Sequence, residues 1–276
     1  MTLVIALKWL GGKGKERVLI SSDSKATFGP ITYEVRKIYP IYFMHEDKEI
    51  DLAIAGGAGD SSIVKQGYKI AELTIKNYSI QAGFRNLTLE EFEKAVQDIE
   101  ARLIRRFAYL RGEGIEPNFE MILASVDPKG KASIYLFDNK GLAEPVHESP
   151  GFAIIGRGAV TGGILLTRLL GYSVGDSVEL DLGMLSAFVI DVVSEIDPTV
   201  GPFVGESILM RVEKGKVIMG PLKPEALRDY KKRVEKRKRL IALLQKICDI
   251  KEISEDGVEK TLSELKSRQN QRLNKF

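Results

Sequence analysis

The sequence predicts an α+β fold, a four-layer αββα sandwich in which two antiparallel sheets pack together and helices cover their outer faces. Its apolar and turn residues follow the order strands, two helices, strands, two helices, strands. Several strand-like runs are apolar at consecutive positions, which is typical of strands covered on both faces. With 276 residues, 44% of them hydrophobic, the chain can bury such a core.

The expected strands before residue 60 are short apolar runs separated by turn residues. Leu3–Trp9 is apolar, and the glycine-rich segment 11–14 after it indicates a turn. Further runs follow at Val18–Ser22, Arg36–Ile41 and Leu52–Ala55. Because their apolar residues are consecutive rather than alternating, these strands are expected to lie inside a layered core.

Two helices are expected next. Ser61 or Ser62 can cap a helix whose apolar residues recur at helical spacing as far as Leu73. Thr88 precedes a segment with the spacing of a capping box, so a second helix is predicted over Leu89–Arg111.

The rest of the body returns to strands, then helices, then a closing hairpin. Asp127–Gly130 has the composition of a hairpin turn. In chain order, the remaining expected elements are strands Glu120–Val126, Ala132–Phe137 and Phe152–Ile155, helices Val160–Leu170 and Leu180–Ile196, and strands Ser207–Val212 and Lys216–Met219.

The charge distribution divides the chain into a body, 1–221, and a charged helical extension, 222–276. Residues 223–276 hold 16 Lys or Arg against 9 Asp or Glu, a net charge of +7, whereas the whole chain carries only +3. Apolar residues from Leu227 to Leu244 recur near helical spacing, and a second helix is expected at Val258–Arg268. Because that apolar stripe is narrow, it is expected to pack on the body or on a neighbouring subunit.

Composition excludes several classes of protein. One cysteine, Cys248, allows no internal disulfide and is expected in an apolar helix face, and two histidines with one cysteine cannot build the usual zinc sites. No metal or organic cofactor is expected.

No apolar run is long enough to span a membrane, and the N-terminus lacks a signal peptide, so a cytoplasmic location is expected. The basic run 231–239 has no interleaved aromatics, which favours a solvated helix face over nucleic-acid binding.

Thr2 is the candidate nucleophile. Aminopeptidases normally remove a methionine that precedes a small residue, which makes Thr2 the new N-terminus. Its hydroxyl can then attack a carbonyl while its own α-amino group, with a pKa of about 8, accepts the proton. The rival Ser-His-Asp triad is disfavoured, because neither His45 nor His147 lies near a Gly-x-Ser-x-Gly segment.

Four sequence blocks accompany Thr2 and carry a family resemblance. They are the opening run 2–8, Val18–Thr27, Arg36–Ile41 and Leu52–Asp60. In this order and spacing they resemble proteasome β-type subunits, which are N-terminal-nucleophile (Ntn) hydrolases. The resemblance covers about residues 1–220 and is sharpest over 1–60.

The resemblance implies a role for each block. Thr2 is the nucleophile, Asp23 and Lys37 are its charged partners, and Gly56 donates its N–H to the oxyanion. A positive charge at Lys37 makes deprotonation of Thr2 easier, and Asp23 holds that charge in place. By the same resemblance, substrate binding falls to Lys25, Ala26, Thr27, Ile54, Gly57 and Ala58.

Later segments match the family less closely. Arg157, followed by Gly158, stands where the family has a serine that helps to orient the N-terminal amine. In the later Asp-x-x-Ser-Gly loop Asp197 is kept, but Val200 replaces the serine and Thr199 stands beside it. Proton transfer at Thr2 or substrate selectivity is therefore expected to differ from the family pattern.

The expected function is a threonine-type peptidase that forms an acyl-enzyme on Thr2, acts on peptides or unfolded proteins, and assembles into a ring-like homo-oligomer. Two alternatives stay open. In a peptide ligase or transamidase, an amine rather than water resolves the acyl-enzyme. In a catalytically silent assembly subunit, the fold serves only to bind partners, and Arg157 and Val200 favour this alternative.

Overall fold

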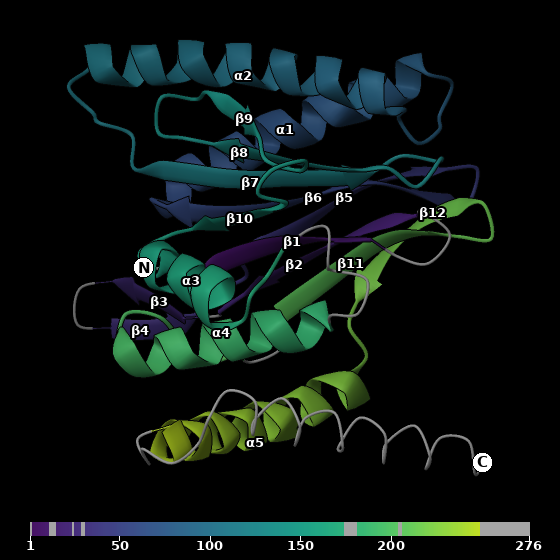
Figure 1. Ribbon diagram of the computed structural model, residues 1–276. Coiled ribbons are helices and arrows are strands. Elements are labelled where there is room, and N and C mark those ends of the chain that lie inside the picture. The colour runs from purple at the N-terminus through teal and green to yellow at the C-terminus, as the bar shows by residue number, and fades with distance from the viewer. Residues whose placement is uncertain are drawn as a thin grey trace. The chain divides into compact units, whose positions relative to one another are not determined.

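The computed structural model describes residues 2–10, 15–23, 25–28, 31–173, 181–203 and 206–248, and only the backbone of 26–28, 31–33 and 244–248. The chain separates into two compact units, Met1–Lys231 and Lys232–Phe276. Two antiparallel five-stranded sheets and a two-stranded hairpin make up the sheet structure of the described residues (Figure 1). The predicted α+β chain with two antiparallel sheets is confirmed.

The first sheet places the N-terminal strand in its interior. Its order is β10 (Phe152–Ile155), β1 (Val4–Leu10), β2 (Glu16–Ser22), β11 (Glu206–Glu213) and β12 (Lys216–Pro221). The first five residues of β1 are buried, the first four of them fully, which confirms that this strand is covered on both faces. The segment that precedes β1 therefore enters the sheet between two partner strands.

The second sheet has the order β5 (Ile38–His45), β6 (Lys48–Gly59), β7 (Phe119–Val126), β8 (Ala132–Phe137) and β9 (Ala143–Pro145). It faces the first sheet across a core of small and branched apolar residues, such as Ala6, Ile20 and Ile122. Burial of this common core is the main force that holds two antiparallel sheets face to face.

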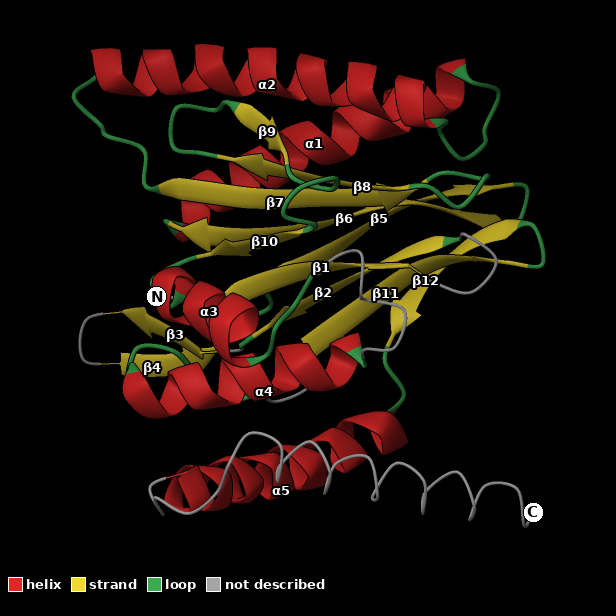
Figure 2. Cartoon of the chain, viewed as in Figure 1, coloured by secondary structure: helices red, strands yellow, loops and turns green. Residues whose placement is uncertain are grey.

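Helices cover the outer faces of the sheets (Figure 2). On the second sheet, α1 (Ser61–Gln81) and α2 (Leu89–Gly112) enclose an aromatic-rich core that includes Phe92, Phe107 and Phe119. On the first sheet, α4 (Leu182–Ile196) packs against β1 and β2. The chain enters that side through α3 (Ala159–Ile164) and the π-helix η2 (Leu165–Leu169), where the sequence predicts one regular helix over Val160–Leu170.

Helix starts test the capping predictions directly. The capping box is confirmed, since Thr88 Oγ1 accepts the N–H of Glu91 and the Glu91 carboxylate accepts the N–H of Thr88. The predicted cap at Ser61 or Ser62 is wrong, because Asp60 is the N-cap and its side chain makes no capping bond. The helix predicted from Leu180 starts at Leu182, with Asp181 as a capping residue that the prediction overlooked.

Several strands differ from their predicted lengths. Strand β5 continues to His45 and β6 begins at Lys48, so the predicted strands Arg36–Ile41 and Leu52–Ala55 are shifted or too short. The turn between β5 and β6 uses Glu46 and Asp47, both with positive φ. Glycine or asparagine normally marks such a turn, so this one carries no strong sequence signal.

The hairpin β3 (Lys25–Phe28) and β4 (Ile31–Glu34) is absent from the sequence prediction, and so is β9. Both lack a strong apolar pattern. By contrast, the turn at Asp127–Gly130 is confirmed, with the N–H of Gly130 bonded to the carbonyl of Asp127 at 2.9 Å.

The C-terminal extension is helical where it is described. Helix α5 (Pro224–Cys248) spans the boundary between the two compact units. The predicted helix Val258–Arg268 and the Cys248 side chain lie outside the description, so the extension 222–276 as a separate domain stays a prediction. No helix in the described part of the chain has the length and apolar character that crossing a membrane requires.

Asp51 in β6 is a buried carboxylate that faces β12. Its Oδ2 accepts a hydrogen bond from the N–H of Met219 at 2.7 Å. Its Oδ1 has no hydrogen-bond partner among the described residues. Burial raises the pKa of Asp51 to about 6, and nearby Glu49 also acts in the upward direction.

Asp51→Asn is therefore expected to stabilise the protein at neutral pH but not in acid. A carboxyl group with a raised pKa in the folded state binds more protons folded than unfolded, so its contribution to stability falls as pH rises from about 4 to about 6. The neutral amide removes this penalty, and the free energy of unfolding should rise by roughly 1–3 kcal/mol at about pH 7.5. Denaturant unfolding of both proteins at that pH and at about pH 3.5 checks this prediction. If Asp51→Asn changed the free energy of unfolding equally at the two pH values, the raised pKa of Asp51 would be contradicted.

Candidate active site

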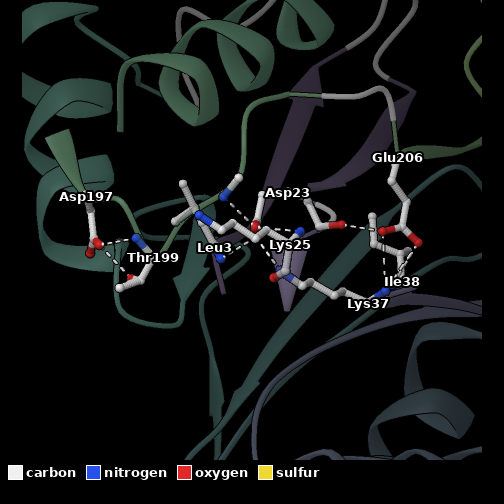
Figure 3. A network of polar contacts seen from close by, with 10 residues as sticks. Leu3, Asp23, Lys25, Lys37, Ile38, Asp197, Thr199 and Glu206 are labelled. Carbon is white, nitrogen blue, oxygen red and sulfur yellow. Dashed lines mark hydrogen bonds and ion pairs between the residues drawn. The ribbon is translucent and has the colours of Figure 1, made fainter. Parts of the chain in front are cut away.

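A buried carboxylate, that of Asp23, is the centre of the polar network near the N-terminus (Figure 3). Asp23 follows β2 directly and is fully buried. Its Oδ1 accepts hydrogen bonds from the N–H of Leu3 at 2.8 Å and from Nζ of Lys37 at 2.6 Å. Its Oδ2 accepts the N–H groups of Lys25 at 3.1 Å and Gly201 at 2.8 Å. Three backbone N–H groups and one ammonium therefore bind the buried Asp23 carboxylate in place of water.

Lys37 supplies the matching positive charge. It immediately precedes β5, and its side chain is 4% exposed. Besides Asp23, its Nζ donates to the backbone carbonyl of Lys25 at 2.6 Å. Burial lowers the pKa of the Lys37 ammonium, while the carboxylates of Asp23 and Glu206 act in the opposite direction. A lowered pKa eases proton exchange with a neighbouring hydroxyl.

Thr2 is held close to this ion pair by its neighbours in the chain. Leu3 pairs with Asp23 in both directions, since the N–H of Asp23 donates to the carbonyl of Leu3 at 3.1 Å. The N–H of Leu3 and Nζ of Lys37 contact the same carboxylate oxygen, so the ammonium lies beside the peptide bond that follows Thr2. The sequence therefore folds Asp23 and Lys37 close to the segment that contains Thr2.

Gly156 closes the other side of Thr2. Its φ is +91°, a conformation that side chains rarely adopt, and an added Cβ would collide with the backbone carbonyl of Thr2. Its N–H donates to Oε2 of Glu120 at 2.8 Å. Glycine is thus required here so that the turn after β10 can lie against the backbone of Thr2.

Thr2 reaches solvent through an open pocket of about 910 Å³. The residue is 8% exposed and forms part of the pocket wall together with Ala58 and Gly156. Four carboxylates and one guanidinium also line the pocket, those of Asp60, Glu116, Glu120, Asp138 and Arg157. A molecule that approaches Thr2 therefore meets a predominantly negative wall.

The loop 197–201 is fastened to the network at two points. Gly201 donates to Asp23, and Nζ of Lys25 donates to the carbonyl of Pro198 at 2.5 Å. Within the loop, Oδ1 of Asp197 accepts both the N–H of Thr199 at 2.9 Å and its hydroxyl at 2.6 Å. These two bonds lower the pKa of Asp197, and the charge of Arg157 lowers it further. Arg157 therefore lies near Asp197 as well as in the pocket wall.

Of the other predicted residues, some line the pocket and others have their contacts elsewhere in the fold. Ala58 lines it, and Gly158 packs against Val200 and Leu3. Gly56 pairs with Ile38 across β5 and β6, which places it beside the Lys37 segment in the interior of the sheet.

Not every predicted substrate-binding residue reaches the pocket surface. Gly57 is buried, and its N–H donates to the carbonyl of Lys37 at 3.1 Å. Ile54 is fully buried in the core between the sheets, so its side chain is not presented to the pocket. Ala26 and Thr27 belong to β3, and their side chains lie outside the description.

Sequence reasoning missed Glu206. Its carboxylate accepts hydrogen bonds from the hydroxyl of Ser22 at 2.7 Å, from the N–H of Lys37 at 3.3 Å and from the N–H of Ile38 at 3.4 Å. The only signal in the sequence is a charged residue shortly before the apolar run Ile208–Met210, and surface strands show the same pattern.

No model of a known protein family matches the chain, and no curated protein matches it.

Proposed function

We propose that the chain is a threonine-type peptidase with an Ntn-hydrolase fold, in which Thr2, exposed by removal of Met1, is the nucleophile. The observation that carries the proposal is the buried Asp23–Lys37 pair, fastened to the peptide that follows Thr2. An ammonium that is desolvated at such a position lowers the cost of forming an alkoxide nearby. The pocket at Thr2 provides access for a peptide.

In the proposed reaction, the Thr2 hydroxyl oxygen attacks the carbonyl carbon of a peptide bond, and the free α-amino group of Thr2 accepts the hydroxyl proton. The C–N bond then breaks, and the departing amine takes up that proton. The product is an ester between Thr2 and the acyl part of the substrate. Water attacks this ester, which releases the acid and restores the hydroxyl.

The chain's own residues supply the other expected roles. Lys37 stabilises developing negative charge at the Thr2 oxygen, and Asp23 fixes the ammonium. The N–H of Gly56 is the expected oxyanion donor, as the resemblance to proteasome β-type subunits implies. Asp197, with Thr199 and Arg157 beside it, is the expected support for the N-terminal amine. A peptide or unfolded-protein substrate and a ring-like homo-oligomer are part of the same proposal.

The test is intact-mass analysis after incubation with a peptide epoxyketone, a reagent that captures an N-terminal threonine through its hydroxyl and amine. We expect a protein that lacks Met1 and gains one adduct per chain, located on Thr2 by peptide mapping. Thr2→Ala should gain none, and Thr2→Ser should keep the adduct because it retains the hydroxyl. Methionine retained on reactive protein would exclude the amine as the base.

Two other outcomes separate the alternatives. A folded protein that forms no adduct would favour the silent assembly subunit. To test the fate of the ester, a peptide substrate is supplied together with a second peptide that has a free amine. Mostly hydrolysed product is expected, whereas mostly joined peptide would identify a ligase.

A further inference from the structure

Glu206 connects the two chain segments that carry the ion pair. It is the first residue of β11 and lies opposite Ser22, the last residue of β2. The hydroxyl of Ser22 donates to Oε2 of Glu206 at 2.7 Å. Ser22 directly precedes Asp23 in the chain. The carboxylate therefore fixes the end of β2 at the point where the chain presents Asp23.

The same carboxylate holds the backbone of Lys37. The N–H of Lys37 lies 3.3 Å from each of the two oxygens, and the N–H of Ile38 lies 3.4 Å from Oε1. On its other side, the Lys37 carbonyl accepts the N–H of Gly57 at 3.1 Å. Lys37 is thus held at both backbone groups, and its side chain starts from a fixed position.

These bonds also join the two sheets. Strand β11 belongs to the first sheet, and β5, which begins at Ile38, belongs to the second. The Glu206 side chain is 20% exposed, so this link is partly protected from water. Figure 3 shows Glu206 reaching from its strand to Lys37 and Ile38, beside the Asp23 network. The link therefore crosses between the sheets at the residues that carry the Asp23–Lys37 pair.

We propose that Glu206 is a positioning residue: by tying Ser22, Lys37 and Ile38 together, its carboxylate sets where the Lys37 ammonium stands relative to Asp23 and Thr2. This inference rests on the proposed function of Thr2. It differs from a purely structural role because the carboxylate also carries charge. The charged groups that face Lys37 are Asp23 after β2 and Glu206 on β11, with Arg36 next to it in the chain.

The two properties of Glu206 can be separated by substitution. Glu206→Gln keeps the shape and removes the charge. Glu206→Asp keeps the charge but shortens the reach. The matched control is Glu213→Gln, which makes the same change at the far end of β11, where Glu213 pairs with Arg211 at 2.8 Å.

Two measurements are made on each folded variant. One is the rate of Thr2 modification by the epoxyketone as a function of pH. The other is the titration of the Lys37 ammonium by nitrogen-15 NMR, with the signal assigned by its loss in Lys37→Met. The NMR measurement does not depend on any reaction at Thr2.

Glu206→Gln is expected to move the Lys37 titration and the alkaline limb of the rate profile to lower pH, by roughly half a unit or more, because removal of a nearby negative charge favours the neutral amine. Its rate at the optimum should fall roughly tenfold. Glu206→Asp should lower the rate while leaving the Lys37 titration close to that of the unmodified protein. Glu213→Gln should change neither.

The inference is overturned if Glu206→Gln lowers the melting temperature but leaves the Lys37 titration and the shape of the rate profile unchanged. If Thr2 is unreactive in every variant while Glu206→Gln shifts the Lys37 titration, the proposed function fails and the link from Glu206 to Lys37 stands. Should Glu206→Gln not fold, Glu206→Asp and Ser22→Ala carry the test. Both weaken the hydrogen bonds of the carboxylate at position 206 without removing its charge. An unchanged rate of Thr2 modification in both variants would therefore overturn the inference.

Discussion

Lys37→Met is expected to lower the rate of Thr2 acylation by at least about 10²-fold, the effect typical of losing a group that stabilises charge or transfers a proton. The Lys37 ammonium is buried and bonded to Asp23 and to the carbonyl of Lys25. Methionine has a similar length but no charge, so packing is largely kept while the electrostatic effect is lost. The rate constant for epoxyketone modification, measured by intact mass, checks this prediction.

The matched control is Lys8→Met. Lys8 forms another buried ion pair, 3.1 Å from Glu16, and it lies on β1, the strand that directly follows the Thr2 segment. This variant should lose stability without losing Thr2 reactivity. If Lys37→Met reacts as fast as the unmodified protein and circular dichroism shows an intact fold, Lys37 has no part in activating Thr2.

Asp23→Ala is expected to have the largest effect on stability of any single change at the site. It leaves the buried Lys37 ammonium with the Lys25 carbonyl as its acceptor. It also removes the carboxylate that accepts three backbone N–H groups. Breaking one side of a buried ion pair costs roughly 3–5 kcal/mol. For a unit of this size that corresponds to a fall in melting temperature of roughly 10 °C or more, with Thr2 reactivity also lost.

A double substitution sharpens this prediction. Asp23→Ala with Lys37→Met should melt at a higher temperature than Asp23→Ala alone, because no ammonium is left buried without its carboxylate, yet Thr2 should stay unreactive. As a control, Asp127→Ala removes another buried aspartate, whose Oδ1 accepts the N–H of Lys131 in a turn, and it should cost about 1 kcal/mol. A melting temperature for Asp23→Ala equal to that of Asp127→Ala would contradict the four-donor account.

Local sequence signals predicted much of the fold. The consecutive apolar residues of β1 and β2, the capping box at Thr88 and the turn at Asp127 each act within a few residues, so their outcome can be read from the chain itself. Prediction failed where the local signal was weak or ambiguous. The β5–β6 turn has positive φ at Glu46 and Asp47 without a glycine, and the helix after Asp60 starts without a side-chain cap.

The candidate site divides in the same way. Asp23 follows a clear apolar strand and Lys37 precedes another, and it was the resemblance to proteasome β-type subunits that singled them out together. Glu206 could not be found by such reasoning, because its partners are Ser22 and the backbone of Lys37 and Ile38. Backbone N–H groups exist at every non-proline position, so the sequence gives no indication of which of them a distant carboxylate will bind.

The bonds of Asp23 and Glu206 to distant parts of the chain have a consequence for the order of events during synthesis. Gly201 is separated from Asp23 by 178 positions, and Glu206 from Ser22 by 184. A nascent chain emerges from the ribosome N-terminus first. The hydrogen bonds from Gly201 to Asp23 and from Ser22 and Lys37 to Glu206 therefore cannot form until most of the body has been synthesised. Contacts of such long sequence separation form late and slow the folding of the whole unit.

Until then β2 also lacks its neighbour β11, and one edge of an apolar strand stays open. A product whose translation stops before β11 is therefore expected to combine an incomplete Asp23–Lys37 network, which lacks Glu206, with an edge prone to aggregation. In this topology the network that holds Asp23 and Lys37 is complete only when β11 has closed that edge.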